Sequence, residues 1–220
     1  RGGDAGIDAM ADDYTSLVWG LIELYQTTKN PEYLQKAIHF QTIFSQEFSD
    51  DENGGYYFTS KNTDTPLGRQ KEIYDGALPS SNSMAALNGF RLARLTGKTD
   101  YESKAEKIFR AFSQVIKDNP SAYTFALITK LTQKNEPREI AVASHSGNNY
   151  LGEILDYLSN QNRFQNSVIL KTEKTQETLR KLSPFTESFP IDESLNIYVC
   201  KNFSCDTPVH SLDNLIENLR

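Results

Sequence analysis

The chain has 220 residues, enough to bury a hydrophobic core in one large domain or two small ones. Its net charge of −6 argues against a nucleic acid or an anionic membrane as partner, because both attract clustered Lys and Arg. No apolar run approaches the roughly 20 residues that span a bilayer, so we expect a soluble protein. The two cysteines do not form the disulfide framework of secreted mini-proteins, which predicts a reducing, cytoplasmic compartment.

Apolar residues at helical spacing predict two helical hairpins in the first half of the chain. The first pairs a helix over 12–28, capped by Asp12 or Asp13, with one over 32–48 that begins after Asn30-Pro31. The second pairs helices over 83–96 and 100–117 through a turn at Gly97. Between the hairpins, the aromatic and β-branched residues 56–59 predict a short strand.

A shift of 68 residues overlays the two hairpins. It places Tyr33-Leu34-Gln35-Lys36-Ala37 on Tyr101-Glu102-Ser103-Lys104-Ala105, and Leu24 on Leu92. Repeated helical hairpins cannot bury their apolar faces alone, so they stack into arrays or closed toroids. A fifth helix that follows Asn119-Pro120 would be the inner half of a third hairpin.

The pattern changes near Pro137. Short apolar runs predict strands over 140–143, 168–170 and 195–200, with helices over 151–158 and 212–219 between and after them. Strand, helix and strand in this order imply a right-handed parallel crossover in a small α/β layer. We therefore predict a helical-hairpin domain over 1–135 and a small α/β domain over 136–220.

The stretch from Lys71 to Ser83 crowds acids, a tyrosine and turn residues ahead of a helix. Ser81, Asn82 or Ser83 can accept hydrogen bonds from the free N–H groups of that helix. Glu72 and Asp75 are three residues apart, and two carboxylates at a helix N-terminus can bind sugar hydroxyls or divide acid and base roles. The alternative is a capped turn whose acids face water, which the residues alone favour.

With this loop, the hairpin repeat and the segment Tyr198–Cys205, the chain resembles the YyaL-like family of thioredoxin-domain-containing proteins. The likeness covers nearly all of the chain, including Asp12-Asp13-Tyr14, Gly54–Thr59 and Pro120–Tyr123. Such proteins carry an amino-terminal thioredoxin-like domain, then an (α/α)6 toroid similar to N-acylglucosamine 2-epimerases. The resemblance implies a mainly α fold, a partial (α/α)6 toroid of the six-hairpin type followed by a small α/β domain. The family loop reads Pro-Ser-Gly-Asn-Ser, and Ser81 at the glycine puts a positive φ there in doubt.

The resemblance also implies a site, because the inner helices of such toroids start at the pocket end. Glu72 and Asp75 are then the candidate catalytic residues. The candidate ligand-binding residues on the same rim are Asp12, Asp13, Tyr14, Tyr74, Asn82 and Ser83. Trp19, one to two turns along the first helix, is a candidate sugar-stacking platform or a core residue.

The chemistry of this rim is constrained by its residue types. Epimerases of this fold use paired histidines, and the helical part contains only His39, so that mechanism is not supported. A carboxylate pair, as in glycoside hydrolases, is chemically allowed. No metal site is predicted, and the cofactor is unknown.

Two further patterns carry weak signals. Cys200 and Cys205 are neither a Cys-x-x-Cys motif nor a complete metal set, so a disulfide, two free thiols and a shared zinc are all open, and we expect reduced structural thiols. Residues 145–149 follow a strand and precede a helix, where α/β folds often bind anions. Because this segment contains a single glycine, we expect an ordinary strand-to-helix connection and not an anion-binding loop.

The sequence thus predicts part of a toroid that binds or processes a carbohydrate-like small molecule, by epimerase-like, isomerase-like or glycoside-processing chemistry if it is an enzyme. The alternative is a non-catalytic scaffold that partners the thioredoxin-like domain of a full-length chain. A closed toroid needs about twelve helices and about five are predicted here, so we expect uncovered apolar flanks and self-association of the isolated chain.

Overall fold

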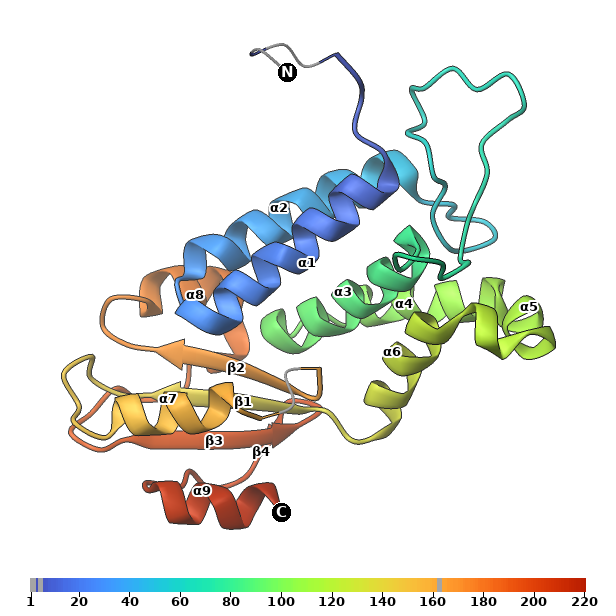
Figure 1. The fold of residues 1–220 in the computed structure, drawn as a ribbon. Helices are drawn as coiled ribbons and strands as arrows, with labels where there is room; N and C mark the ends of the chain where they lie inside the picture. The colour runs from blue at the N-terminus through green and yellow to red at the C-terminus, as the bar shows by residue number, and fades with distance from the viewer. Residues whose placement is uncertain (1–2, 4–5, 162–163) are drawn as a thin grey trace.

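The computed structural model describes residues 3, 6–161 and 164–220, which form a helical part followed by a mixed sheet (Figure 1). The helical part consists of α1 (Ala11–Thr28), α2 (Pro31–Phe48), α3 (Ser81–Thr96), α4 (Thr99–Ala111), α5 (Ser113–Asp118), the 3-10 turn η1 (Pro120–Ala122) and α6 (Thr124–Lys134). The second part consists of β1 (Arg138–Ala143), α7 (Leu151–Ser159), β2 (Asn166–Lys171), α8 (Gln176–Leu182), the 3-10 turn η2 (Pro184–Thr186), β3 (Asn196–Lys201), β4 (Ser204–Cys205) and α9 (Leu212–Leu219). A mainly α fold with a carboxy-terminal α/β part is confirmed.

Local signals set the start of α2 and the end of α3 as predicted, whereas α1 begins after Met10, so that Asp12 and Asp13 lie in its first turn. The Asn30 side chain accepts a hydrogen bond from the backbone N–H of Glu32 at 3.0 Å, and Pro31 occupies the first turn of α2. The cap of α3 was predicted wrongly: Ser80, one residue before the predicted candidates, accepts from the N–H of Ser83, because the helix already begins at Ser81. Gly97 ends α3 at φ 76°, a left-handed conformation that glycine adopts without steric cost.

Two further local predictions were wrong, and one helix was missed. The expected strand over 56–59 is a single bridge between Ser49 and Tyr56, because Phe58 donates instead to the carbonyl of Gln70. The expected helix over 100–117 divides at Phe112 into α4 and α5. Helix α8 lay in a segment for which no element was predicted.

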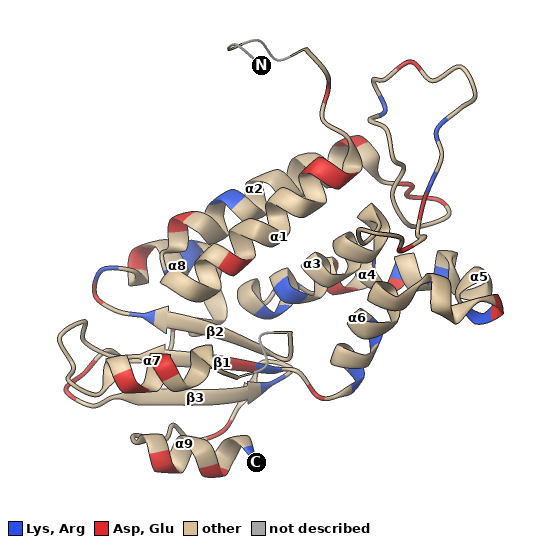
Figure 2. Ribbon diagram, in the orientation of Figure 1, with Lys and Arg blue, Asp and Glu red and all other residues tan. Residues whose placement is uncertain are grey.

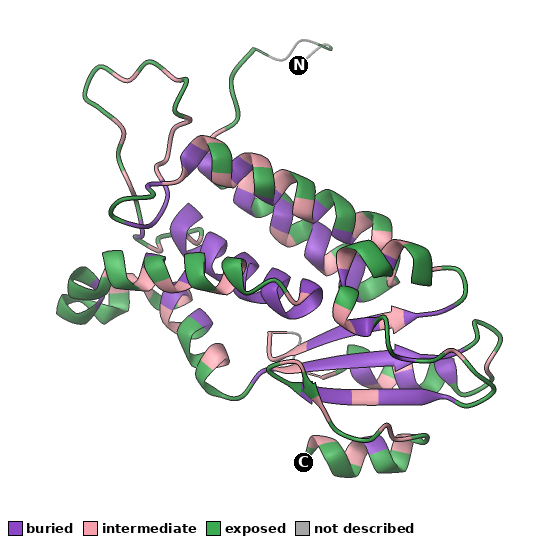
Figure 3. Cartoon of the chain, turned by 180° about the vertical axis from the view of Figure 1, so that it is seen from behind, coloured by how far each residue is buried: buried purple, intermediate pink, exposed green. Residues whose placement is uncertain are grey.

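The central element of the helical part is α3, with α1 and α6 beside it and α4 behind. All 16 residues of α3 are buried, as its unbroken purple colour in Figure 3 shows. The repeat appears as contacts between equivalent positions of α1 and α3. Glu23 pairs with Arg91 at 2.5 Å, and the Ser16 hydroxyl lies 3.6 Å from the sulfur of Met84, both pairs being 68 residues apart. The two helices therefore run side by side in the same direction.

The sheet has the strand order β2-β1-β3-β4. Strands β1 and β2 are parallel, which confirms the predicted parallel crossover through α7, and β3 is antiparallel to β1. Alternate residues of β1 face opposite sides. Ile140 and Val142 pack in a cluster with α7 and α9, whereas Ala141 and Ala143 pack with Phe189 and Cys200.

The sheet and the helical hairpins share one hydrophobic cluster. Ile169 of β2 and Leu179 of α8 pack with Val18, Leu34 and Leu92 from α1, α2 and α3. The domain boundary that we predict after residue 135 falls between α6 and β1. The two parts on either side of it are thus in direct apolar contact.

A glutamine side chain closes the outer edge of the sheet. The amide of Gln26 on α1 donates to the carbonyl of Val168 and accepts from its N–H, each at 3.0 Å. These are the two hydrogen bonds that a further strand would make with β2. Because an exposed edge strand invites pairing with other chains, this contact protects the sheet.

Cys200 and Cys205 form a disulfide across β3 and β4. The expectation of reduced thiols was therefore wrong, because the hairpin register places the two residues directly opposite each other. Ser81 lies in the first turn of α3 without a positive φ. In the part of the chain that the structure describes, no helix is long and apolar enough to cross a membrane.

Candidate functional site

Asp75 anchors the loop between the hairpins to the start of two helices. One carboxylate oxygen accepts from the N–H of Ser80 at 3.0 Å. The other accepts from Phe125 at 2.9 Å and Ala126 at 3.1 Å in the first turn of α6. Three amides thus occupy both oxygens, which makes Asp75 a helix cap and a clamp between α3 and α6.

Asn82 and Ser83 are buried inside the same structure. The Asn82 amide accepts from the N–H of Tyr56 at 2.8 Å and donates to the carbonyls of Tyr56 and Glu72 at 2.9 and 2.7 Å. Ser83 is paired with Ser80, which caps α3. Both side chains are closed off from solvent and hold the loop in place.

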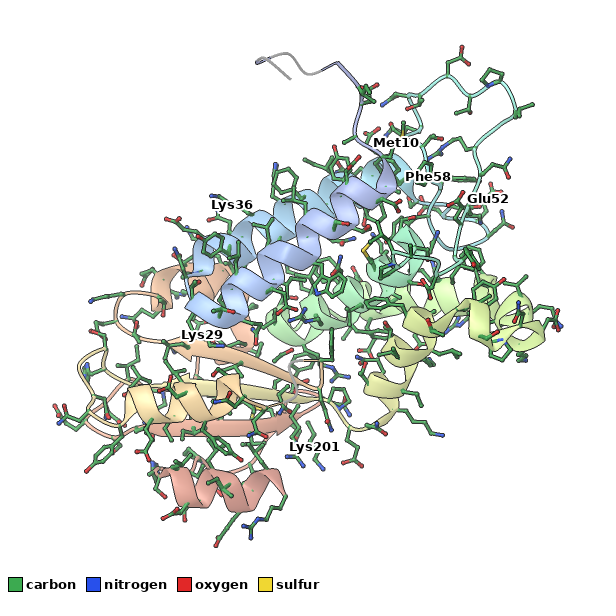
Figure 4. All side chains as sticks on the ribbon, viewed as in Figure 1. Met10, Lys29, Lys36, Glu52, Phe58 and Lys201 are labelled. Atoms are coloured by element: carbon green, nitrogen blue, oxygen red, sulfur yellow. A yellow bond between two sulfur atoms is a disulfide. The ribbon has the colours of Figure 1, made fainter. Side chains whose placement is uncertain are left out.

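The predicted residues at the start of α1 have different surroundings. Asp13 accepts from the N–H of Met10 at 2.8 Å and so caps its own helix, and Tyr14 packs on an aromatic cluster that includes Phe48. Asp12 faces the start of α3 near Ser81, and burial raises the pKa of its carboxyl. Figure 2 marks the two acids in red at this end of α1, and Figure 4 shows the labelled Met10 just before it.

Trp19 contacts two neighbours. Its indole N–H donates to Glu23 at 3.0 Å, and its ring centroid lies 5.2 Å from that of Phe125. The ring therefore fills the space between α1 and α6.

Glu72 and Tyr74 line an open cleft of about 430 Å³. The rest of its lining comes from Lys71, Ile73, Phe112, Val115 and Tyr123. Tyr74 is 64% exposed, and Glu72 is also exposed, so both can meet a ligand. The cleft combines aromatic rings with a carboxylate.

Lys71, one of the residues that line this cleft, belongs to a charged network. The Lys71 ammonium donates to the Asp50 carboxylate at 2.8 Å and to the carbonyl of Gly54 at 2.9 Å. Asp50 also accepts from the Tyr57 hydroxyl at 3.0 Å. The hydrogen bond from Lys71 holds the pKa of Asp50 well below its usual range, so this carboxylate stays ionised.

The residues that were predicted to share one rim thus fall into three groups in the structure. Glu72 and Tyr74 lie in the cleft, Asp75, Asn82 and Ser83 support the loop behind it, and the other candidates lie along α1. Sequence reasoning missed Phe112, Val115 and Tyr123 as lining residues. They reach the cleft because the chain bends between α4 and α6, and no local motif marks that bend. No metal-holding group of three or more His, Cys, Asp or Glu side chains occurs in the described residues.

Comparison with known proteins gives relatives but no matching family model. The chain is 30% identical over 216 residues to an uncharacterised protein of Caenorhabditis elegans. It is 27% identical over 201 residues to Spermatogenesis-associated protein 20 of Rattus norvegicus, and 26% identical over 200 residues to that of Homo sapiens. These proteins are its homologues.

The relatives are much longer than this chain. The match covers 98% of the chain but 29% of the C. elegans protein, and 90% of the chain but 25% of the rat and human proteins. The alignment therefore includes the helical part and the sheet together.

Proposed function

We propose that this chain is the ligand-binding part of a helical toroid and that it binds a carbohydrate-like molecule in the cleft at Glu72 and Tyr74. The observation that carries this proposal is that the exposed Tyr74 ring and the exposed Glu72 carboxylate line the same concave site. Sugars stack their C–H faces on aromatic rings, and a carboxylate accepts hydrogen bonds from their hydroxyls. Tyr123 and Phe112 supply further aromatic surface in the lining of the cleft.

The arrangement of the helices supports the toroid. In this proposal α1, α3 and α6 are inner helices, and α2 and α4 are outer ones. Leu17 and Leu24 on α1 and Ile128 and Leu131 on α6 are between 44% and 57% exposed at the two flanks. Further hairpins of a longer chain would cover these flanks, and without them the isolated chain would self-associate. The length of the relatives and the resemblance to YyaL-like thioredoxin-domain proteins agree with this.

Binding is better supported than catalysis by a carboxylate pair. General acid and base roles need two carboxyl groups that are both free to exchange protons with the substrate. The two oxygens of Asp75 are engaged by three backbone amides, so Glu72 is left without a second accessible carboxylate from the predicted pair.

A non-catalytic scaffold is the second candidate. The loop that precedes the cleft projects from the body of the molecule (Figure 1), and Leu67 in it is 93% exposed. An exposed leucine on a projecting loop suits contact with another protein domain, and a thioredoxin-like domain of a longer chain would be the partner.

Calorimetric titration of the chain with a panel of mono- and oligosaccharides tests the binding proposal. We expect Tyr74→Ala and Glu72→Gln each to weaken binding about ten-fold, since each removes one of the two contact types. Tyr150→Ala is the matched control, because Tyr150 is equally exposed but lies before α7, in the α/β part. Absence of saturable binding, or an equal loss in the control, would refute the proposal.

A further inference from the structure

The turn of the hairpin that carries the disulfide has an unfavourable backbone conformation. Asn202 and Phe203 connect the paired residues Lys201 and Ser204, and their φ angles are 51° and 61°. Two-residue hairpin turns with two left-handed residues favour Asn-Gly, because glycine has no Cβ to clash. Asn202 tolerates this conformation, but Phe203 is a bulky residue for which it is unfavourable.

The tip of this hairpin contacts the helical part. The Arg94 guanidinium on α3 donates to the side-chain oxygen of Asn202 at 2.8 Å. The Phe203 N–H donates to the Glu139 carboxylate on β1 at 3.0 Å, and its ring lies 5.2 Å from that of Phe185. Lys201, labelled in Figure 4, marks the end of β3 where the chain turns toward these partners.

These contacts surround a buried ion pair. Arg94 and Glu139 are joined at 2.8 Å, and the Glu139 side chain is fully buried. Burial raises the pKa of Glu139, while the Phe203 N–H and the Arg94 guanidinium act in the opposite direction. The hairpin tip therefore supplies one hydrogen bond to each charge at the junction of α3 and β1.

We propose that the Cys200–Cys205 disulfide is a redox-sensitive latch that keeps the hairpin tip on the Arg94–Glu139 pair. Strand β4 is two residues long, so few backbone hydrogen bonds oppose opening. The disulfide offsets the unfavourable turn at Phe203. Once it is reduced, the tip withdraws and the sheet loses this tie to the carboxy-terminal end of α3.

The burial of the two sulfurs sets the order of the reduction. Cys205 is half-buried, whereas Cys200 is fully buried beside Ala141, Ala143 and Phe189. A thiolate of a dithiol reductant attacks the Cys205 sulfur, the S–S bond breaks, and the electron pair leaves on Cys200, which takes up a proton. The second thiol of the reductant then attacks the reductant's own sulfur in the mixed disulfide. This attack releases the Cys205 thiolate, which takes up a proton, and the reductant leaves as a cyclic disulfide. In total, the protein gains two electrons and two protons.

Limited digestion with chymotrypsin tests the latch, since this protease cleaves after aromatic residues. We expect dithiothreitol to raise the cleavage rate after Phe203 about ten-fold in the folded chain. Cleavage after Tyr74, which lies in the exposed loop between α2 and α3 and is distant from Phe203 in sequence, is the internal control and should not change. The Cys200→Ala/Cys205→Ala variant should be cleaved quickly with or without dithiothreitol. Equal cleavage of the oxidised and reduced chain, or a disulfide that resists dithiothreitol until the chain unfolds, would overturn the proposal.

A second variant separates the latch from a general loss of stability. Phe203→Gly creates the Asn-Gly pair that suits this turn, so closure should no longer depend on the disulfide. Deuterium exchange of the residue 203 amide should then rise less than about three-fold on reduction, against about ten-fold in the parent chain. An equal rise in both would refute the role assigned to the turn.

Discussion

Replacing Gln26 with leucine removes the amide that closes the outer edge of β2. Gln26 is 8% exposed and makes two hydrogen bonds of 3.0 Å to the backbone of Val168, which is also buried. Leucine is of similar size but has no polar atoms. The substitution therefore leaves one backbone N–H and one carbonyl unpaired in a buried place.

The magnitude follows from these two groups. Each buried polar group left unpaired costs about 1–3 kcal/mol, and the added apolar burial of leucine recovers about 1 kcal/mol. We therefore expect the free energy of unfolding to fall by about 1–5 kcal/mol in urea denaturation monitored by circular dichroism.

The matched control is Gln114→Leu. Among the described residues, the Gln114 amide bonds the exposed side chain of Asp118 on α5, so its replacement should change the free energy of unfolding by less than about 0.5 kcal/mol. If Gln26→Leu is as stable as this control, the edge contact contributes nothing measurable and the reasoning fails.

Three further predictions concern the loop, its charged support and the apolar flanks. Asp75→Ala should lower the free energy of unfolding by about 2–3 kcal/mol in urea, because three backbone amides lose their acceptor. The control Glu72→Gln should change it by less than about 0.5 kcal/mol. Equal effects of the two substitutions would contradict the roles assigned to these acids. Asp50→Asn should cost about 1–3 kcal/mol at pH 7 in thermal melts. The pKa of Asp50 is depressed by Lys71, so its contribution is present above the ordinary value of 3.8 and is lost as the pH falls through the folded-state pKa. The difference between the parent and this variant should thus shrink below about pH 4. Leu24→Lys with Leu131→Lys should reduce self-association of the isolated chain in light scattering, and an unchanged particle size would argue that these flanks are not its cause.

Much of the fold follows from short-range patterns in the sequence. Asn30-Pro31 and Gly97 end and start helices through their own backbone preferences, so α1, α2 and α3 were predicted within two residues of their observed ends. The 68-residue repeat predicted that the two hairpins are neighbours, because repeated hairpins bury their apolar faces by packing against each other. The parallel pairing of β1 and β2 followed from the helix between them.

The role of each acid could not be read in the same way. Glu72 and Asp75 are alike in sequence, yet only Asp75 meets the N–H groups of Phe125 and Ala126, which lie 50 and 51 residues further along the chain. Whether a carboxylate caps a helix or faces a ligand depends on which distant backbone the fold brings to it. Phe112 and Tyr123 joined the cleft for the same reason.

The sequence by itself determined α1, α2 and α3, the repeat and the parallel pairing of β1 with β2, because propensity, capping and periodicity act over a few residues. The tertiary structure alone decided that Cys200 and Cys205 are joined. Their pairing depends on the register of β3 and β4, and the hairpin tip is held by Arg94 and Glu139, more than sixty residues away from it. Contacts across such distances form only when the whole chain packs, and no local pattern encodes them.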